Sequence, residues 1–159
     1  MTEQRSRVLV STRIAATPAR VFEAFTEEIA QWWRPNVLFQ LGAGGPGSLS
    51  FVPGPDGRLV ESSPDGSEFV VGEVRTWEPP NRLVLSWREE SFDEDQETEL
   101  HVRFDAVDAG TRVTVEHFGW EGIPIEHAAR HGFELGLFQR RFAEWVQAWL
   151  TGLRTVAER

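Results

Sequence analysis

Apolar and polar residues alternate along most of the chain, and this pattern predicts a series of short strands. Residues 7–14 (RVLVSTRI) place every second side chain on one face, which is typical of a strand with one buried side. Further strands are predicted near 48–52, 58–62 and 68–77, between the turn sequences PGPDG and SPDG. Alternation then continues through 83–88, 99–104 and 112–117, which indicates an antiparallel meander.

Two segments have helical spacing instead. The first helical segment begins at Thr17-Pro18. The threonine side chain can accept a hydrogen bond from the unpaired backbone amides of the first turn, and proline suits the first helical position. The apolar spacing of this segment runs to Trp32-Trp33, and Pro35 ends it. The second helix is predicted over about 137–156, with one apolar stripe made of Phe138, Phe142, Trp145, Trp149 and Leu153. These elements favour a curved sheet that grips one long helix, a layout that tends to enclose an apolar cavity.

The length and composition indicate one α+β domain over residues 1–159. No apolar run approaches the roughly 20 residues that cross a bilayer, so we expect no membrane insertion. The first residues, MTEQRSRVLV, lack the apolar segment of a secretory signal. A cytoplasmic protein is therefore expected.

The net charge of −9 argues against nucleic acid as a partner, because it repels the phosphate backbone. Much of this charge lies in residues 89–99 (EESFDEDQETE), which hold seven acidic residues and no basic one. We interpret this run as a solvated hairpin tip, with a docking site for a protein partner as the alternative.

The absence of three residue types narrows the candidate chemistry. The chain has no Cys, Lys or Tyr, which excludes a thiolate nucleophile, a lysine Schiff base and a phenol proton donor. His, carboxylates, Ser/Thr and Arg remain, without the arrangement of a hydrolase triad. No cofactor is expected.

The histidines are the most informative polar residues. His117 follows Val113 and Val115 on the same strand face, so it should point toward the helix, where it could orient a ligand or act as a base. The alternative is a core histidine bonded to a backbone carbonyl. His127 and His131 are four residues apart and would share a helix face, but without a metal-binding motif we expect no metal site.

Four segments in order resemble a known family. VFEAFTEEIAQWW, GEVRTWEPPNRLVLSW, GTRVTVEHFGW and the closing aromatic helix are similar to the AHSA-like family, the homologues of the activator of a heat-shock-protein ATPase, within the START/SRPBCC superfamily. The resemblance runs from about Val8 to Leu153. It implies the helix-grip fold, with two short helices near the N-terminus, a cavity for a hydrophobic molecule in many members, and a link to stress response.

The function we expect is binding of a hydrophobic lipid-, aromatic- or polyketide-like molecule in an internal cavity, without a defined reaction. The expected lining is aromatic with one polar anchor: Trp32, Trp33, Phe39, Phe51, Trp87, His117, Trp120, Phe138 and Phe142. One alternative is a cavity enzyme of the cyclase, dehydratase or hydrolase kind that uses His117. The other is a protein-interaction or chaperone-linked module that uses the acidic 89–99 hairpin. Whether the protein forms a homodimer is left open.

Overall fold

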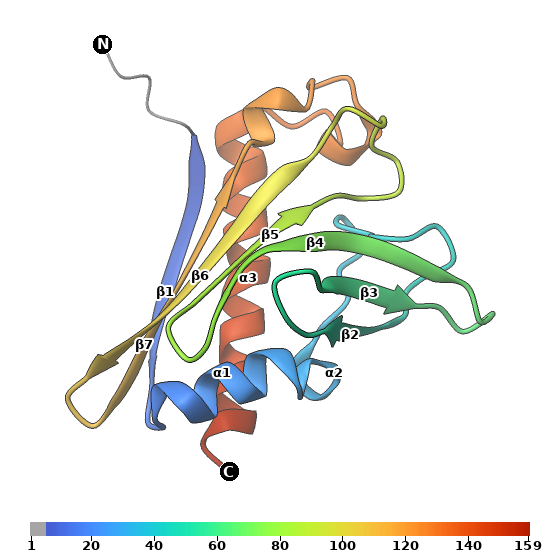
Figure 1. Cartoon of the computed structure of the whole chain (residues 1–159). Helices are drawn as coiled ribbons and strands as arrows, with labels where there is room; N and C mark the ends of the chain where they lie inside the picture. The colour runs from blue at the N-terminus through green and yellow to red at the C-terminus, as the bar shows by residue number, and fades with distance from the viewer. Residues whose placement is uncertain (1–5) are drawn as a thin grey trace.

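In the computed structural model, which describes residues 6–159, antiparallel strands form one sheet in the order β1-β7-β6-β5-β4-β3-β2. Their bounds are β1 Arg7–Ile14, β2 Ser48–Val52, β3 Arg58–Ser62, β4 Glu68–Glu78, β5 Arg82–Trp87, β6 Thr98–Val107 and β7 Gly110–Phe118. The alternating pattern placed all of these strands to within a few residues. The sheet curves around one long helix, α3, while shorter helices cross one of its ends (Figure 1).

The helices begin close to where the sequence predicts them. α1 spans Pro18–Thr26, and its N-cap Thr17 accepts a hydrogen bond from the Arg20 amide (3.2 Å). α2 spans Ile29–Trp32, and α3 spans Leu135–Ala157, two residues earlier than predicted. Two short 3-10 helices, η1 (Trp120–Gly122) and η2 (Ala128–Arg130), connect β7 to α3.

The concave face of the sheet buries the aromatic stripe of α3. Phe138, Phe142 and Leu153 are fully buried, as is Trp149 at 1% exposure, while the opposite helix face carries exposed residues such as Arg140. The fold is therefore the α+β helix-grip fold that the sequence analysis expects. Among residues 6–159, no helix is both long and apolar enough to cross a membrane.

The C-terminal half of α3 lies close against α2 because residue 152 has no side chain. A Cβ atom at Gly152 would lie 2.9 Å from the Trp32 carbonyl oxygen and 3.2 Å from the Trp32 Cβ. Nearby, the Arg20 guanidinium bonds to Glu28 and donates to the Val156 carbonyl (3.0 Å), which ties α1 to the end of α3. These contacts set the distance of α3 from α1 and α2.

We predict that Gly152→Ala destabilises the protein although alanine is the better helix former. The propensity gain of about 1 kcal/mol is offset by an overpacking cost of about 1–3 kcal/mol at the Trp32 backbone. Gly136→Ala is the matched control, because no atom lies within 4 Å of a Cβ there, and it should stabilise by up to about 1 kcal/mol. Urea unfolding of both variants measures the difference, and equal effects would contradict this account of the α2–α3 contact.

Candidate functional site

The predicted site residues converge on the concave face from five different segments. Phe138 and Phe142 come from α3, Trp87 from the end of β5, His117 from β7, Trp120 from η1, and Phe39 from the loop after α2. All six are at most 2% exposed. Trp33 joins them at 8% exposure, and Trp32 lies behind it with ring centroids 6.2 Å apart. Phe51 is half-buried and contacts Phe25 and Trp77 instead.

These rings pack directly against one another. The His117 ring centroid lies 4.7 Å from that of Phe142, 5.2 Å from that of Trp120 and 5.6 Å from that of Trp87. The Trp120 and Phe138 centroids are also 4.7 Å apart. The Trp149 ring centroid lies 5.6 Å from that of Trp87. We call these six rings the aromatic cluster: Trp87, His117, Trp120, Phe138, Phe142 and Trp149. A molecule that entered it would have to displace rings rather than fill existing space.

His117 is fully buried, and its hydrogen bonds identify its tautomer. Its Nε2 lies 2.6 Å from the Thr98 hydroxyl, which itself lies 3.1 Å from the Trp87 carbonyl. A carbonyl can only accept, so the single hydroxyl proton points to Trp87 and His117 Nε2 must carry the ring proton. Burial lowers the pKa of His117 to about 3, so the ring is neutral. Its Nδ1 is then a buried acceptor, and it has no partner.

Three indole groups in the aromatic cluster are also without partners. The Nε1–H groups of Trp87, Trp120 and Trp149 are buried and make no hydrogen bond. Other tryptophans of the core do find one: Trp32 donates to the Ala24 carbonyl (2.9 Å) and Trp145 to the Arg34 carbonyl (2.8 Å). The cluster therefore holds three donors and one acceptor that the fold leaves unused. Trp149 was absent from the predicted site, although its place on the helical stripe could have identified it.

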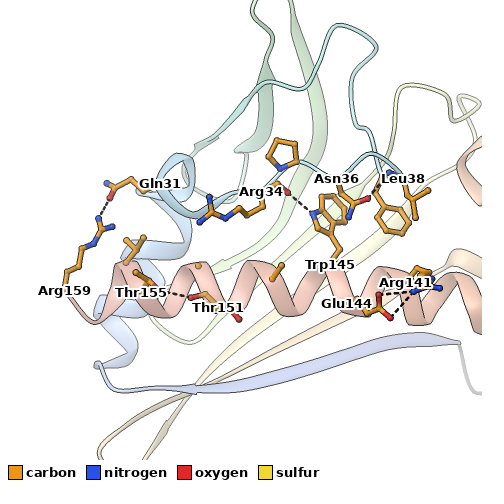
Figure 2. A pocket seen from close by; sticks show the side chains of 15 residues that line it. Gln31, Arg34, Asn36, Leu38, Arg141, Glu144, Trp145, Thr151, Thr155 and Arg159 are labelled. Atoms are coloured by element: carbon orange, nitrogen blue, oxygen red, sulfur yellow. Dashed lines mark hydrogen bonds and ion pairs between the residues drawn. The ribbon is translucent and has the colours of Figure 1, made fainter.

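A groove runs along the outer side of α3, between this helix and residues 31–39 (Figure 2). It has a volume of about 770 Å³ and polar edges, where Arg159 donates to Gln31 (3.0 Å) and Arg141 pairs with Glu144 (3.3 Å). Phe39 and Trp145 stack with centroids 5.2 Å apart and line this groove. The same two rings line a small cavity of about 20 Å³ beside Trp33. This ring pair thus separates the groove from the interior.

A second hollow, of about 430 Å³, lies where residues 37–43, residues 89–91 and η2 meet. Glu89 lines it, two residues after the end of β5. Its side chain is only 4% exposed, and burial raises the pKa of its carboxyl to about 8. The acidic run is therefore not uniformly solvated, which corrects the sequence interpretation. Asp93, Glu94 and Asp95, at the tip of this β5–β6 connection, are exposed as predicted, as are Glu90 and Glu97.

His127 and His131 do not share a helix face. They flank η2, where the Nδ1 of His127 accepts from the Ala129 amide (3.0 Å) and His131 has a left-handed backbone (φ 53°). His131 bonds through Nε2 to the Leu38 carbonyl. Among residues 6–159, no group of three or more His, Asp or Glu side chains is arranged to hold a metal ion.

Comparisons with known proteins identify the family. Residues 15–156 match the family described as Activator of Hsp90 ATPase homolog 1-like protein. No curated protein sequence matches the chain.

Solved structures share the fold at low sequence identity. A protein from Mesorhizobium loti is 19% identical with a TM-score of 0.65, over 95% of this chain and 96% of that one. The solution structure of an Aha1 dimer from Colwellia psychrerythraea is 15% identical with a TM-score of 0.66, over 96% of each chain. DynU16, from the dynemicin biosynthetic locus, is 20% identical with a TM-score of 0.67, over 96% of this chain but 47% of its own.

The pKa of Glu89 leads to a prediction about stability and pH. Between the unfolded value of 4.5 and the folded value of about 8, the folded protein holds one extra proton, so this group makes stability fall as pH rises. Glu89→Gln removes the effect. The variant should match the native protein near pH 4.5 and exceed its free energy of unfolding by about 4 kcal/mol near pH 8.

Chemical denaturation across this pH range measures the difference, with the exposed Glu94→Gln as the control for loss of one charge. His117 has the opposite slope, because its lowered pKa costs stability as pH falls from 6.5 toward about 3. That contribution is the same in both proteins and cancels in the difference. A Glu89→Gln difference that does not grow with pH would contradict the burial of an unpaired carboxyl.

Proposed function

We propose that this protein, which belongs to the Activator of Hsp90 ATPase homolog 1-like family, binds a hydrophobic small molecule of lipid, aromatic or polyketide type between its sheet and α3. The observation that carries this proposal is the set of unused polar groups in the aromatic cluster. Three indole N–H groups and the Nδ1 of His117 are buried there without partners.

Unused buried groups are costly, which is why they point to a ligand. A buried donor or acceptor without a partner costs about 1–3 kcal/mol, and most such groups in proteins are satisfied. Four of them in contact with one another concentrate this cost in one place. A ligand that supplied the missing partners would recover part of that free energy on binding.

The donor or acceptor character of these groups indicates which functional groups the ligand should carry. Because the indoles donate and the neutral His117 Nδ1 accepts, the ligand should carry a carbonyl or ether oxygen together with a hydroxyl group. Its body should be flat and apolar to replace ring contacts at 4.7–5.6 Å. The stacked Phe39 and Trp145 rings, which line both the outer groove and the small inner cavity, offer a route inward.

A cavity enzyme is the second candidate, and the tautomer of His117 favours it. An unprotonated, unpaired Nδ1 is the form that a general base requires. Because burial lowers the pKa of this ring to about 3, this function needs a ligand that raises the pKa toward neutral. Such an enzyme would deprotonate a hydroxyl or an acidic C–H of the ligand held against the indoles. Turnover of a bound molecule by the native protein, lost in a His117 variant that still binds it, would identify this function.

The proposed binding can be tested by native mass spectrometry. The purified protein, alone and after incubation with a library of hydrophobic metabolites, should carry a small-molecule adduct that leaves on denaturation. His117→Leu should reduce adduct occupancy by about tenfold, the loss expected for one buried hydrogen bond. It should still fold, because Thr98 keeps its bond to the Trp87 carbonyl.

His101→Leu is the matched control. His101 lies on the adjacent strand β6 but is half-exposed and bonds to Glu99, outside the aromatic cluster. This variant should retain the adduct. A bare protein mass under every condition, or equal loss in both variants, would contradict binding at His117.

A further inference from the structure

The hollow of about 430 Å³ beside Glu89 has a lining unlike that of the aromatic cluster. Its apolar part consists of small or aliphatic side chains, and one of them, Val37, is 84% exposed. The remaining apolar side chains are those of Leu38, Leu41, Ala43, Ala128 and Ala129. The hollow is therefore an open, aliphatic site of modest size at the surface.

The ionisable groups that face this hollow are mainly acidic. Its ionisable lining residues are Glu89, Glu90 and His131, and no arginine lines it among residues 6–159. The rim groups already have partners: Glu90 accepts from the Ala43 amide, and His131 bonds to the Leu38 carbonyl. Glu89 is different, because its Oε2 is buried and makes no hydrogen bond.

A comparison with Glu61 shows that the Glu89 carboxyl has no structural use. Both residues are 4% exposed. The oxygens of Glu61 accept from the Gly42 amide (2.9 Å) and the Gly47 amide (3.4 Å), so Glu61 holds the glycine-rich loop in place. Glu89 has no such role, and a buried carboxyl without a donor costs free energy that the fold does not recover.

We propose that this hollow is a second binding site, separate from the aromatic cluster, which takes an organic ammonium ion on a small apolar body, with Glu89 as its counter-ion. The ammonium group donates to the unpaired Glu89 oxygen, and the apolar body covers Val37, Leu38 and Ala129. The free carboxyl is protonated at neutral pH, so binding of the ammonium ion releases the Glu89 proton to solvent. Because Glu89 is buried, the resulting bond between the ammonium group and the carboxylate is charge-assisted and poorly screened by solvent. This site does not depend on the proposed ligand of the aromatic cluster.

The test compares benzylamine with benzyl alcohol by isothermal titration calorimetry on the native protein. The titrations are run at pH 8.5, above the pKa of about 8 at which the Glu89 carboxyl ionises. Both probes have the same ring and nearly the same shape, and only the amine is charged at this pH. Benzylamine should bind at least tenfold more tightly, as expected for a charge-assisted hydrogen bond. In Glu89→Gln this preference should fall to about twofold or less.

Two control variants separate the possible causes. Glu94→Gln removes the same charge from an exposed position and should keep the full preference for the amine. His117→Leu should also keep it, so failure of one proposed site leaves the other intact. Equal affinity for both probes, a preference that survives Glu89→Gln, or the same loss in Glu94→Gln would each overturn the proposal.

A measurement without variants locates the probe directly. Amide NMR signals of Leu41, Ala129 and Ser91 should shift as benzylamine is added to the native protein, because these residues line the hollow with Glu89. Shifts that centre on His117 and Trp120 instead would place the amine in the aromatic cluster and overturn the second site.

Discussion

The structure depends on one constraint, which is that a single helix must fill the concave face of a curved sheet. Large rings on α3, the strands and the segment after α2 meet this demand, and each buried ring removes about 150–250 Å² from water. The approach of α3 to α2 at Gly152 sets how deeply the helix lies. Every other feature of the interior follows from packing rings of this size at close range.

Indole rings fill such a core well, but each brings an N–H group that needs an acceptor. Trp32 donates to the Ala24 carbonyl and joins α2 to α1, and Trp145 donates to the Arg34 carbonyl and joins α3 to the segment after α2. Trp87 and Trp120 lie where strand and helix backbones are already paired, and their N–H groups stay unused. In one part of the core the indole N–H groups are hydrogen-bonded and stabilise the fold. In the other part they remain unpaired and available to a ligand.

The two buried glutamates show the same division. Glu61 and Glu89 are equally buried, yet the first is surrounded by free loop amides and the second by aliphatic side chains. The aromatic cluster and the hollow beside Glu89 thus both hold buried polar groups that the stability of the fold does not explain. They differ in character, since the first is neutral and enclosed and the second is acidic and open.

The sequence by itself determined the strands, the capped start of α1, the aromatic face of α3 and the family, because alternation, capping residues and helical spacing are local properties. It also predicted that His117 points inward, since strand parity is local too. Only the tertiary structure decided which partners each buried group finds. The Thr98 hydroxyl that sets the His117 tautomer is 19 residues away, and the left-handed His131 breaks a helical spacing that looked regular. Whether a polar atom is paired depends on segments distant in the chain, and no local pattern records that.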